Sequence, residues 1–298
     1  MYSTARPVYF HVRTPMHAGT GAELGIVDLP IQRERATGYP KVEGSSLKGA
    51  IREAFRHLHS NGIEKADSTL LFGPDSDEDD LHAGALGFTD ARLLFFPVKS
   101  AKGVFAWITC PAVLRRWKED LSFADVEMAL RIPSGDTIPH RSMLPMAKNG
   151  DERTIVLEEF AHTLKADDDA QEIAAWIGEH VLGMARFQDQ MAVLSDDAFR
   201  DYVEMNTEII TRTKINSATG TVADGQLFTE EYLPAESILY FLTMASPLRV
   251  KNRKETALGD RKDPDGTDVL GFFADHCPET VQIGANATIG KGLVRVLR

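Results

Sequence analysis

The most constraining feature of the sequence is a helical pattern that begins directly after Gly44. Apolar residues recur there at intervals of three and four: Leu47, Ala50, Ile51, Ala54, Phe55 and Leu58. This spacing places them on one face of a helix, and such a face is normally buried against another element. The preceding Gly44-Ser45-Ser46 offers a serine as N-cap, so the sequence predicts where this helix begins.

Strand patterns surround this helix without a regular alternation of strand and helix. Runs rich in β-branched and aromatic residues predict strands at 8–13, 84–98, 103–109, 236–244, 280–283 and 293–297. A helix is predicted from Pro111, the region 168–202 is predicted to be largely helical, and the charged stretch 249–268 is predicted to be a loop. Tracts 207–216 and 226–232 flank Gly220 and Asp224-Gly225, the pattern of a long hairpin. This mixture favours an α+β fold over a doubly wound sheet.

The composition is that of a globular protein with enough apolar material for a full core. The chain has 298 residues, of which 43% are hydrophobic. No run approaches the roughly 18 apolar residues of a membrane span, and the first residues lack the apolar stretch of a signal peptide, so a cytoplasmic location is expected. Cys110 and Cys277 lie far apart, which predicts two buried free thiols and neither a disulfide framework nor a zinc site.

The charge distribution leaves room for a nucleic-acid ligand although the total is unfavourable. A net charge of -11 argues against phosphate binding, which usually leaves a basic footprint. The acid is concentrated in 75–80 and 151–204, whereas 1–65 carries more Lys and Arg than acid and the tail after Glu279 carries bases alone. A local cationic groove on an acidic protein is therefore compatible with the sequence.

The stretch from His17 to Arg33 is the first candidate site. It is glycine-rich and irregular, and it contains Asp28 just before Leu29-Pro30. A carboxylate in such a loop can bind a divalent metal or accept a proton. Local sequence alone favours an aspartate that caps a turn before Pro30, and a structural histidine at His17.

Two further candidates consist of cations beside turns or helices. Lys48, Arg52 and Arg56 recur every four residues, so they form a column that would suit either a phosphate backbone or an ordinary solvated face. The turn 283–293 contains Lys291 but lacks the order of a P-loop, so its backbone N–H groups would cradle RNA phosphates or simply close a tight turn.

The predicted hairpin is the fourth candidate. Its first strand carries the cations Arg212 and Lys214, and its second half carries acids and aromatic residues. Such a hairpin can reach across a nucleic-acid strand and contact a neighbouring subunit, although an ordinary surface hairpin would have a similar pattern.

Taken in order along the chain, these segments resemble the RAMP superfamily of CRISPR-associated proteins. The likeness is strongest to the repeated backbone subunit of type III-B, or Cmr, effector complexes. The motifs that carry it lie at 14–21, 25–34, 44–49, 83–92, 103–107, 227–231 and 289–292. Each is weak alone, but all of them occur in order over nearly the whole chain.

The resemblance implies a single domain over 1–298 with an α+β, ferredoxin-like (RRM-type) core at 1–110 and 236–298. It also implies a largely helical insertion at about 111–206 and a protruding thumb β-hairpin at about 207–235. Copies of such a subunit form a helical filament along a guide RNA, together with other Cmr subunits, and cleave the paired target RNA at regular intervals.

The resemblance also assigns residues. The aspartate of the D-x-P-I-Q-R pattern, here Asp28, is the implied catalytic residue and ligand of a divalent cation, expected to be Mg²⁺. His17 and Glu231 are implied as auxiliary catalytic residues. RNA-binding roles fall to Arg33, Ser45, Ser46, Lys48, Arg52, Arg212, Lys214 and Lys291.

Three alternatives remain open at this stage. The chain would be a non-catalytic guide-RNA scaffold if Asp28 served only the loop. It would be a guide-processing endoribonuclease if one of its histidines did acid–base chemistry; the candidates are His11, His17, His57 and His59. A small-molecule enzyme that uses the glycine loops for a nucleotide is the third.

Overall fold

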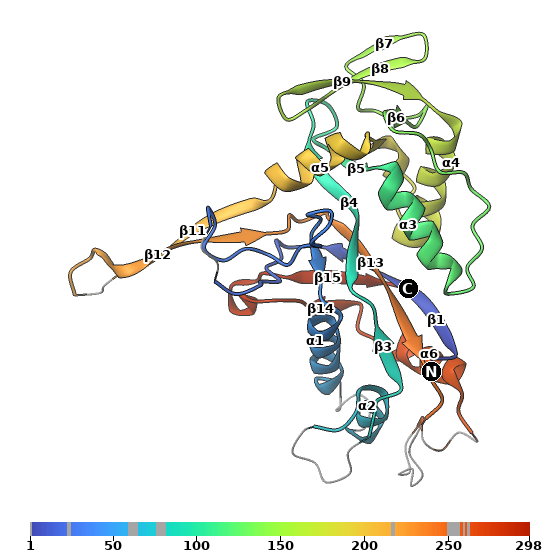
Figure 1. Cartoon of the computed structure of the whole chain (residues 1–298), viewed down its shortest axis with the longest axis vertical. Helices are drawn as coiled ribbons and strands as arrows, with labels where there is room; N and C mark the ends of the chain where they lie inside the picture. The colour runs from blue at the N-terminus through green and yellow to red at the C-terminus, as the bar shows by residue number, and fades with distance from the viewer. Residues whose placement is uncertain are drawn as a thin grey trace.

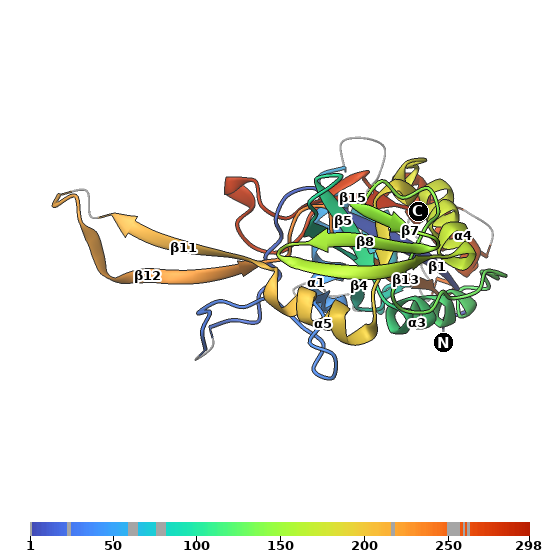
Figure 2. The same ribbon diagram turned by 90° about the horizontal axis from the view of Figure 1, so that it is seen from above.

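The protein is described by a computed structural model that covers residues 2–22, 25–58, 65–75, 82–215, 218–248, 257–258, 260 and 263–298, without the side chains of Lys214 and 223–226. Within these residues, thirteen strands form one mixed sheet in the order β14-β15-β1-β13-β4-β5-β10-β6-β9-β8-β7, with β2 and β3 off this path. A separate two-stranded hairpin projects from the body (Figures 1 and 2).

One half of the large sheet brings the two ends of the chain together. Its strands are β1 (Thr4–Val12), β2 (Lys41–Val42), β3 (Leu86–Phe88), β4 (Ala91–Lys99), β13 (Ile238–Ala245), β14 (Thr280–Gln282) and β15 (Leu293–Leu297). β1 lies between β13 and β15 and pairs antiparallel with both. The helices of this half are α1 (Gly44–Arg56), α2 (Lys65–Phe72) and α6 (Gly266–His276). Phe55 of α1 stacks on Phe273 of α6 with ring centroids 5.8 Å apart, so these two helices pack together on the sheet.

The other half of the sheet contains the segment between β5 and the hairpin. Its strands are β5 (Phe105–Thr109), β6 (Thr137–Ile138), β7 (Ala147–Asn149), β8 (Glu152–Leu157), β9 (Phe160–Ala166) and β10 (Met191–Val193). Its helices are α3 (Pro111–Ser122), α4 (Asp168–Ile177) and α5 (Asp196–Met205), with a π-helical turn at Gly178–Leu182 and a 3₁₀ turn at Phe187–Asp189. β10 runs parallel to β5, and β6 runs parallel to β9. Trp117 of α3 is fully buried, which anchors that helix to the sheet.

The protruding hairpin consists of β11 (Glu208–Ile215) and β12 (Val222–Tyr232). The register places Thr211 opposite Thr229 and Thr213 opposite Leu227, with an irregularity before Ile215. Its base joins α5 to the segment that leads into β13, so the hairpin is continuous with the core at both ends (Figure 1).

Most predicted elements are found close to their predicted bounds. The predicted helix after Gly44 is α1, with Leu47, Ile51 and Phe55 buried, and Cys110 and Cys277 are buried free thiols. The predicted serine cap is wrong: Glu43 is the N-cap residue and makes no side-chain capping bond, and the serines lie in the first turn. The described residues contain no helix that is long and apolar enough to span a membrane.

The predicted largely helical character of 111–206 is wrong for its central part, where β6 to β9 form. β8 and β9 are joined by a two-residue turn, since Leu157 pairs with Phe160. Glu158 adopts a φ of 49° in that turn, a conformation that favours Gly or Asn. The turn therefore lacks its usual sequence signal, and the strands on either side were not recognised.

The predicted loop at 249–268 lies mostly outside the described residues. Its end is not a loop, because α6 begins at Gly266. Asp265 caps this helix in a capping box with Asp268. The signal was present in the sequence as two aspartates three residues apart before an apolar run.

Candidate functional site

The loop between β1 and β2 lies against the base of the hairpin and is joined to β12 by an isolated β-bridge between Leu29 and Glu230. The N–H of Leu29 donates to the carbonyl of Thr229 at 3.0 Å, and the N–H of Glu231 donates to the carbonyl of Leu29 at 3.0 Å. Met16 and Leu233 exchange backbone hydrogen bonds farther along the same edge. The loop is thus fixed to β12 by main-chain bonds that span about two hundred residues of sequence.

Asp28 is exposed at the seam between this loop and β12, and its carboxylate is held by a single residue of β12. Its Oδ2 accepts hydrogen bonds from the Thr229 N–H at 2.8 Å and from the Thr229 hydroxyl at 2.9 Å. The N–H of Asp28 donates in turn to the same hydroxyl at 3.0 Å. These bonds from Thr229 lower the pKa of the Asp28 carboxyl below its ordinary value of 3.8. Asp28 is therefore an ionised, solvent-facing carboxylate that bonds across to the hairpin.

His17 is buried beneath the same seam. Its Nδ1 donates to the carbonyl of Glu231 at 2.6 Å, and its ring lies 5.5 Å from that of Tyr232. A Cβ at Gly19 would lie 2.6 Å from His17 Nε2, so the loop covers the other ring nitrogen. This geometry suits a structural histidine that supports the loop.

Glu231 is buried and fastens the loop to the hairpin. Its Oε2 accepts from the Ile31 N–H at 3.0 Å, and its Oε1 accepts from Arg33 at 2.5 Å and from the Thr207 hydroxyl at 2.8 Å. Burial acts to raise the pKa of Glu231, but the Arg33 guanidinium and these hydrogen bonds lower it below its ordinary value. Arg33 also donates to the carbonyl of Gly38 at 2.7 Å, so its guanidinium is engaged within the protein.

A second polar cluster joins the hairpin to the C-terminal turn. Arg212 donates to Glu230 at 2.9 Å and to the Tyr232 hydroxyl at 2.8 Å. The Tyr232 hydroxyl donates to Glu230 and accepts from Asn286 at 2.8 Å. Lys291 lies over the Tyr232 ring, with its Nζ 4.9 Å from the centroid. Arg212 and Lys291, which sequence reasoning treated separately, thus meet at one tyrosine.

The C-terminal turn uses its glycines and its backbone donors for contacts within the chain. A Cβ at Gly284 would lie 2.2 Å from the carbonyl oxygen of His17, and both Gly284 and Gly292 have positive φ. The N–H of Gly292 donates to Pro15, and the N–H of Lys291 donates to Asn286. The predicted phosphate cradle of free N–H groups is wrong for these positions, because their donors already bond carbonyls of the chain.

Only part of the column of cations on α1 is available to bind a ligand. Arg52 donates to the carbonyl of Gly73 at 3.0 Å and to Asp75 at 2.7 Å, and Arg56 contacts the same Asp75 oxygen at 2.5 Å. Lys48 is half-buried, and burial together with the charge of Arg52 lowers the pKa of its amine. Within the described residues Lys48 has no acidic partner, so it is the cation of the column that is left for a ligand.

The start of α1 is connected to the loop through Gln32. Its Nε2 donates to the carbonyl of Gly19 at 3.2 Å and to the Ser46 hydroxyl at 3.4 Å, while its Oε1 accepts from the Glu43 N–H at 2.7 Å. Ser45 and Ser46 are exposed in the first turn. The exposed N-terminus of α1 and the loop that carries Asp28 therefore form one connected surface.

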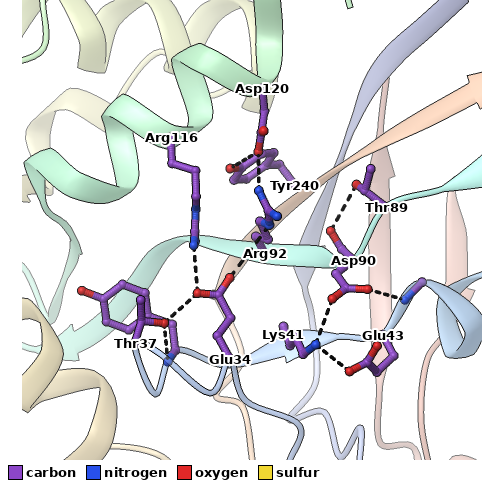
Figure 3. A network of polar contacts seen from close by, with 12 residues as sticks. Glu34, Thr37, Lys41, Glu43, Thr89, Asp90, Arg92, Arg116, Asp120 and Tyr240 are labelled. Atoms are coloured by element: carbon purple, nitrogen blue, oxygen red, sulfur yellow. Dashed lines mark hydrogen bonds and ion pairs between the residues drawn. The ribbon is translucent and has the colours of Figure 1, made fainter. Parts of the chain in front are cut away.

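The chain between the loop and α1 is held by a polar network that reaches across the sheet (Figure 3). Glu34 accepts from Arg116 of α3 at 2.8 Å and lies 3.9 Å from Arg92 of β4. Asp120 of α3 accepts from Arg92 at 2.9 Å and from the hydroxyl of Tyr240 on β13 at 2.8 Å. These contacts fix the segment after Arg33 to both halves of the sheet.

A second part of this network secures the first turn of α1. Asp90 accepts from Lys41 at 2.9 Å and from the Gly44 N–H at 2.9 Å (Figure 3). Burial acts to raise the pKa of Asp90, but Lys41 and this N–H lower it. The Asp90 carboxylate thus accepts a hydrogen bond from the Gly44 N–H at the start of α1, where neither serine provides a cap.

The predicted site residues fall into two groups around the hairpin base and one on α1. The structure brings Asp28, His17, Glu231 and Arg33 together at the loop, and brings Arg212 to Lys291. Lys214 lies in β11, but its side chain is outside the described part. Sequence reasoning missed Thr229, Glu230, Tyr232 and Asn286, whose roles depend on contacts between segments that are distant in the sequence.

No cluster that could hold a metal by itself is found where the structure is described: no group of three or more His, Cys, Asp or Glu side chains has suitable geometry. Asp28 would supply one carboxylate. Mg²⁺ commonly takes one or two protein carboxylates and fills its other positions with water and phosphate oxygens. The donor set is therefore compatible with a cation shared with a phosphate ligand.

Comparison with known proteins gives a consistent match over the whole chain. The family model described as the RAMP superfamily matches residues 9–295. The CRISPR system Cmr endoribonuclease Cmr4 of Pyrococcus furiosus is 38% identical over 295 residues, which cover 97% of this chain and 94% of that protein. The CRISPR system CMR subunit Cmr4 of Saccharolobus solfataricus is 25% identical and covers 99% and 96%. The crystal structure of oligomeric Cmr4 from Pyrococcus furiosus superposes with a TM-score of 0.70 at 31% identity, covering 99% of this chain and 97% of that one.

Proposed function

Because the chain belongs to the RAMP superfamily, and within it to the Cmr4 family, we propose that it is a guide-RNA-binding backbone subunit of a type III-B CRISPR complex. In this role several copies form a filament along the guide and each cleaves the paired target RNA, which gives cuts at regular intervals. The partners are the guide RNA, the target RNA, further copies of the chain and the other Cmr subunits, in the cytoplasm.

The position of Asp28 is the observation that carries the proposal. Its carboxylate is exposed and ionised, and it is fixed on the seam between a glycine-rich loop and a protruding hairpin. A turn-capping aspartate would instead bond to its own turn. The arrangement supports Asp28 as the catalytic residue, with His17 and Glu231 assisting by holding the loop.

The chemistry proposed is transesterification within the target RNA. A 2′-oxygen forms a bond to the adjacent phosphorus while the bond from phosphorus to the 5′-oxygen breaks, which leaves a 2′,3′-cyclic phosphate and a 5′-hydroxyl. Asp28 orients the attacking 2′-hydroxyl or binds the divalent cation, expected to be Mg²⁺, which supplies charge neutralisation at the phosphate. A lysine or arginine would favour the negative charge that develops on phosphorus, and Lys291 of the C-terminal turn is our candidate for this role.

The hairpin is proposed to act as the thumb that separates bases of the guide–target duplex. Four of its apolar side chains are more than 40% exposed: Ile209, Ile215, Val222 and Leu227. Exposed apolar side chains on a rigid hairpin suit contact with unstacked bases. Arg212 and Lys214 on β11 would lie beside the backbone of the RNA.

The remaining RNA contacts are proposed for the loop and α1. Lys48 and the exposed Ser45 and Ser46 would contact the guide backbone, because helix N-termini and free amines both favour phosphate. The guanidinium groups of Arg33 and Arg52 already bond to Glu231 and Asp75. These two arginines would therefore contact RNA only while also keeping those internal partners.

We assign the sheet of 1–110 and 236–298 to a ferredoxin-like core within one domain, with 207–235 as the thumb. The segment 111–206 is then an insertion into this core, and it contains both helices and strands.

The experiment is target cleavage by the assembled complex containing Asp28→Asn. We expect complete loss of the product ladder, with assembly and RNA affinity unchanged, because the substitution removes one charge from an exposed position. Asp169→Asn, at a partly exposed position in the first turn of α4 and far from the loop, is the matched control. Normal cutting by Asp28→Asn would favour the scaffold alternative. Cutting of repeat RNA by the isolated chain would favour guide processing, and failure of the complex to bind RNA would favour a small-molecule enzyme.

A further inference from the structure

The Asp28 carboxylate is bound asymmetrically. Both donors of Thr229, its N–H and its hydroxyl, reach Oδ2, at 2.8 and 2.9 Å. In the part of the chain that the structure describes, no side chain donates a hydrogen bond to Oδ1. One oxygen is thus committed to the hairpin, and the other is left to meet a ligand.

We propose that Thr229 is a positioning residue for RNA cleavage, which holds Asp28 by Oδ2 so that Oδ1 faces the target RNA. This inference rests on the proposed function, since it assigns a partner to the catalytic carboxylate. The hydroxyl of Thr229 is the central element, because it donates to Oδ2 and also accepts from the N–H of Asp28 at 3.0 Å. It therefore fixes the side chain and the backbone of Asp28 together.

The contact also ties Asp28 to the hairpin more than to the body of the protein. Leu29 bonds to the carbonyl of the same Thr229, and Glu231 bonds to the carbonyl of Leu29. Asp28 therefore moves with β12, and a hairpin placed between bases carries the carboxylate to the phosphate beside them. Orientation of this kind contributes to rate by restricting the reacting groups to a productive geometry.

The test is single-turnover cleavage of labelled target RNA by the assembled complex, with the target dissociation constant measured in parallel. Thr229→Val keeps the β-branched shape and the N–H but removes the hydroxyl. We expect the cleavage rate constant to fall roughly tenfold to a hundredfold, the value of a hydrogen bond to a charged group. The dissociation constant should not change, because the role assigned to Thr229 is to hold Asp28 and not to bind RNA.

Three companion variants make the result decisive. Thr229→Ser restores the hydroxyl, so we expect a rate within about threefold of the native chain. Thr229→Ala repeats the loss without the added methyl group, in case the valine prevents assembly. Thr163→Val makes the same change at an exposed strand threonine that lies opposite Thr154, and should leave the rate unchanged.

The outcomes separate this inference from the proposed function. If Asp28→Asn is inactive but Thr229→Val and Thr229→Ala cut at the native rate, the positioning role is wrong and the function of Asp28 stands. If Thr229→Ser is as slow as Thr229→Val, the residue acts through its shape, and the inference is also wrong. If Asp28→Asn cuts normally, the assignment of Asp28 itself fails.

Discussion

Glu231→Ala should lower the free energy of unfolding, because the Glu231 carboxylate joins the loop to the hairpin. Glu231 accepts hydrogen bonds from Ile31, Arg33 and Thr207, and its side chain is only 8% exposed. Removing one partner of a buried ion pair costs about 3–5 kcal/mol of folding free energy. Arg33 is 23% exposed and keeps its bond to Gly38, so water relieves part of this loss. We therefore expect a decrease of about 2–3 kcal/mol in the free energy of unfolding.

The measurement is urea denaturation of the isolated chain at neutral pH, with Glu127→Ala as control. Glu127 is exposed and has no contact that the structure records, so its loss should change the unfolding free energy by less than about 0.5 kcal/mol. A Glu231→Ala value no larger than that of the control would refute the reasoning. It would mean that Glu231 does not hold the loop, as expected for a side chain that serves only in catalysis.

The same comparison has a predicted pH dependence. The pKa of Glu231 is lowered in the folded protein relative to its ordinary value of 4.5. The ionised form therefore adds stability above about pH 4.5, and this contribution is lost as the pH falls through the lower pKa of the folded state. The difference in unfolding free energy between the native chain and Glu231→Ala should thus be full at pH 7 and should shrink in acid. A difference that grows on acidification would contradict the pairing.

Two further changes test the turn and the helix that border the site. Gly292→Ala should lower the melting temperature by about 4–8 °C, because its φ is +75° and the new Cβ would lie 2.0 Å from the carbonyl oxygen of Ile283. Gly290→Ala, with a φ of +74° and no neighbour within 4 Å, should cost clearly less; an equal loss would exclude the close approach as the cause. Lys48→Ala should weaken guide-RNA binding and reduce the slope of log affinity against log salt by about 0.7, with no change in melting temperature. Lys148→Ala on exposed β7 should leave both unchanged, and an unchanged slope for Lys48→Ala would remove that residue from the RNA contact.

The elements that the sequence predicts well are those whose pattern is local. The apolar spacing after Gly44 and the turn residues between β11 and β12 each lie within one segment, so α1 and the hairpin could be recognised. β8 and β9 could not, since Glu158 occupies a turn position that a glycine would have marked. The strands of the large sheet were found individually, but their order depends on contacts between distant segments, such as β1 with β13.

The candidate site shows the same limit more sharply. Asp28 stands out in the sequence because of its neighbours, yet its orientation is set by Thr229, which lies 201 residues away. Local reasoning treated Asp28 as a turn residue or a ligand, and treated the hairpin as a separate feature. The structure makes them one unit, because Leu29 of the loop forms a β-bridge with Glu230 of β12. When RNA displaces the hairpin, we therefore expect the Asp28 carboxylate to be displaced with it. Cleavage should then depend on whether the hairpin occupies its position between the bases.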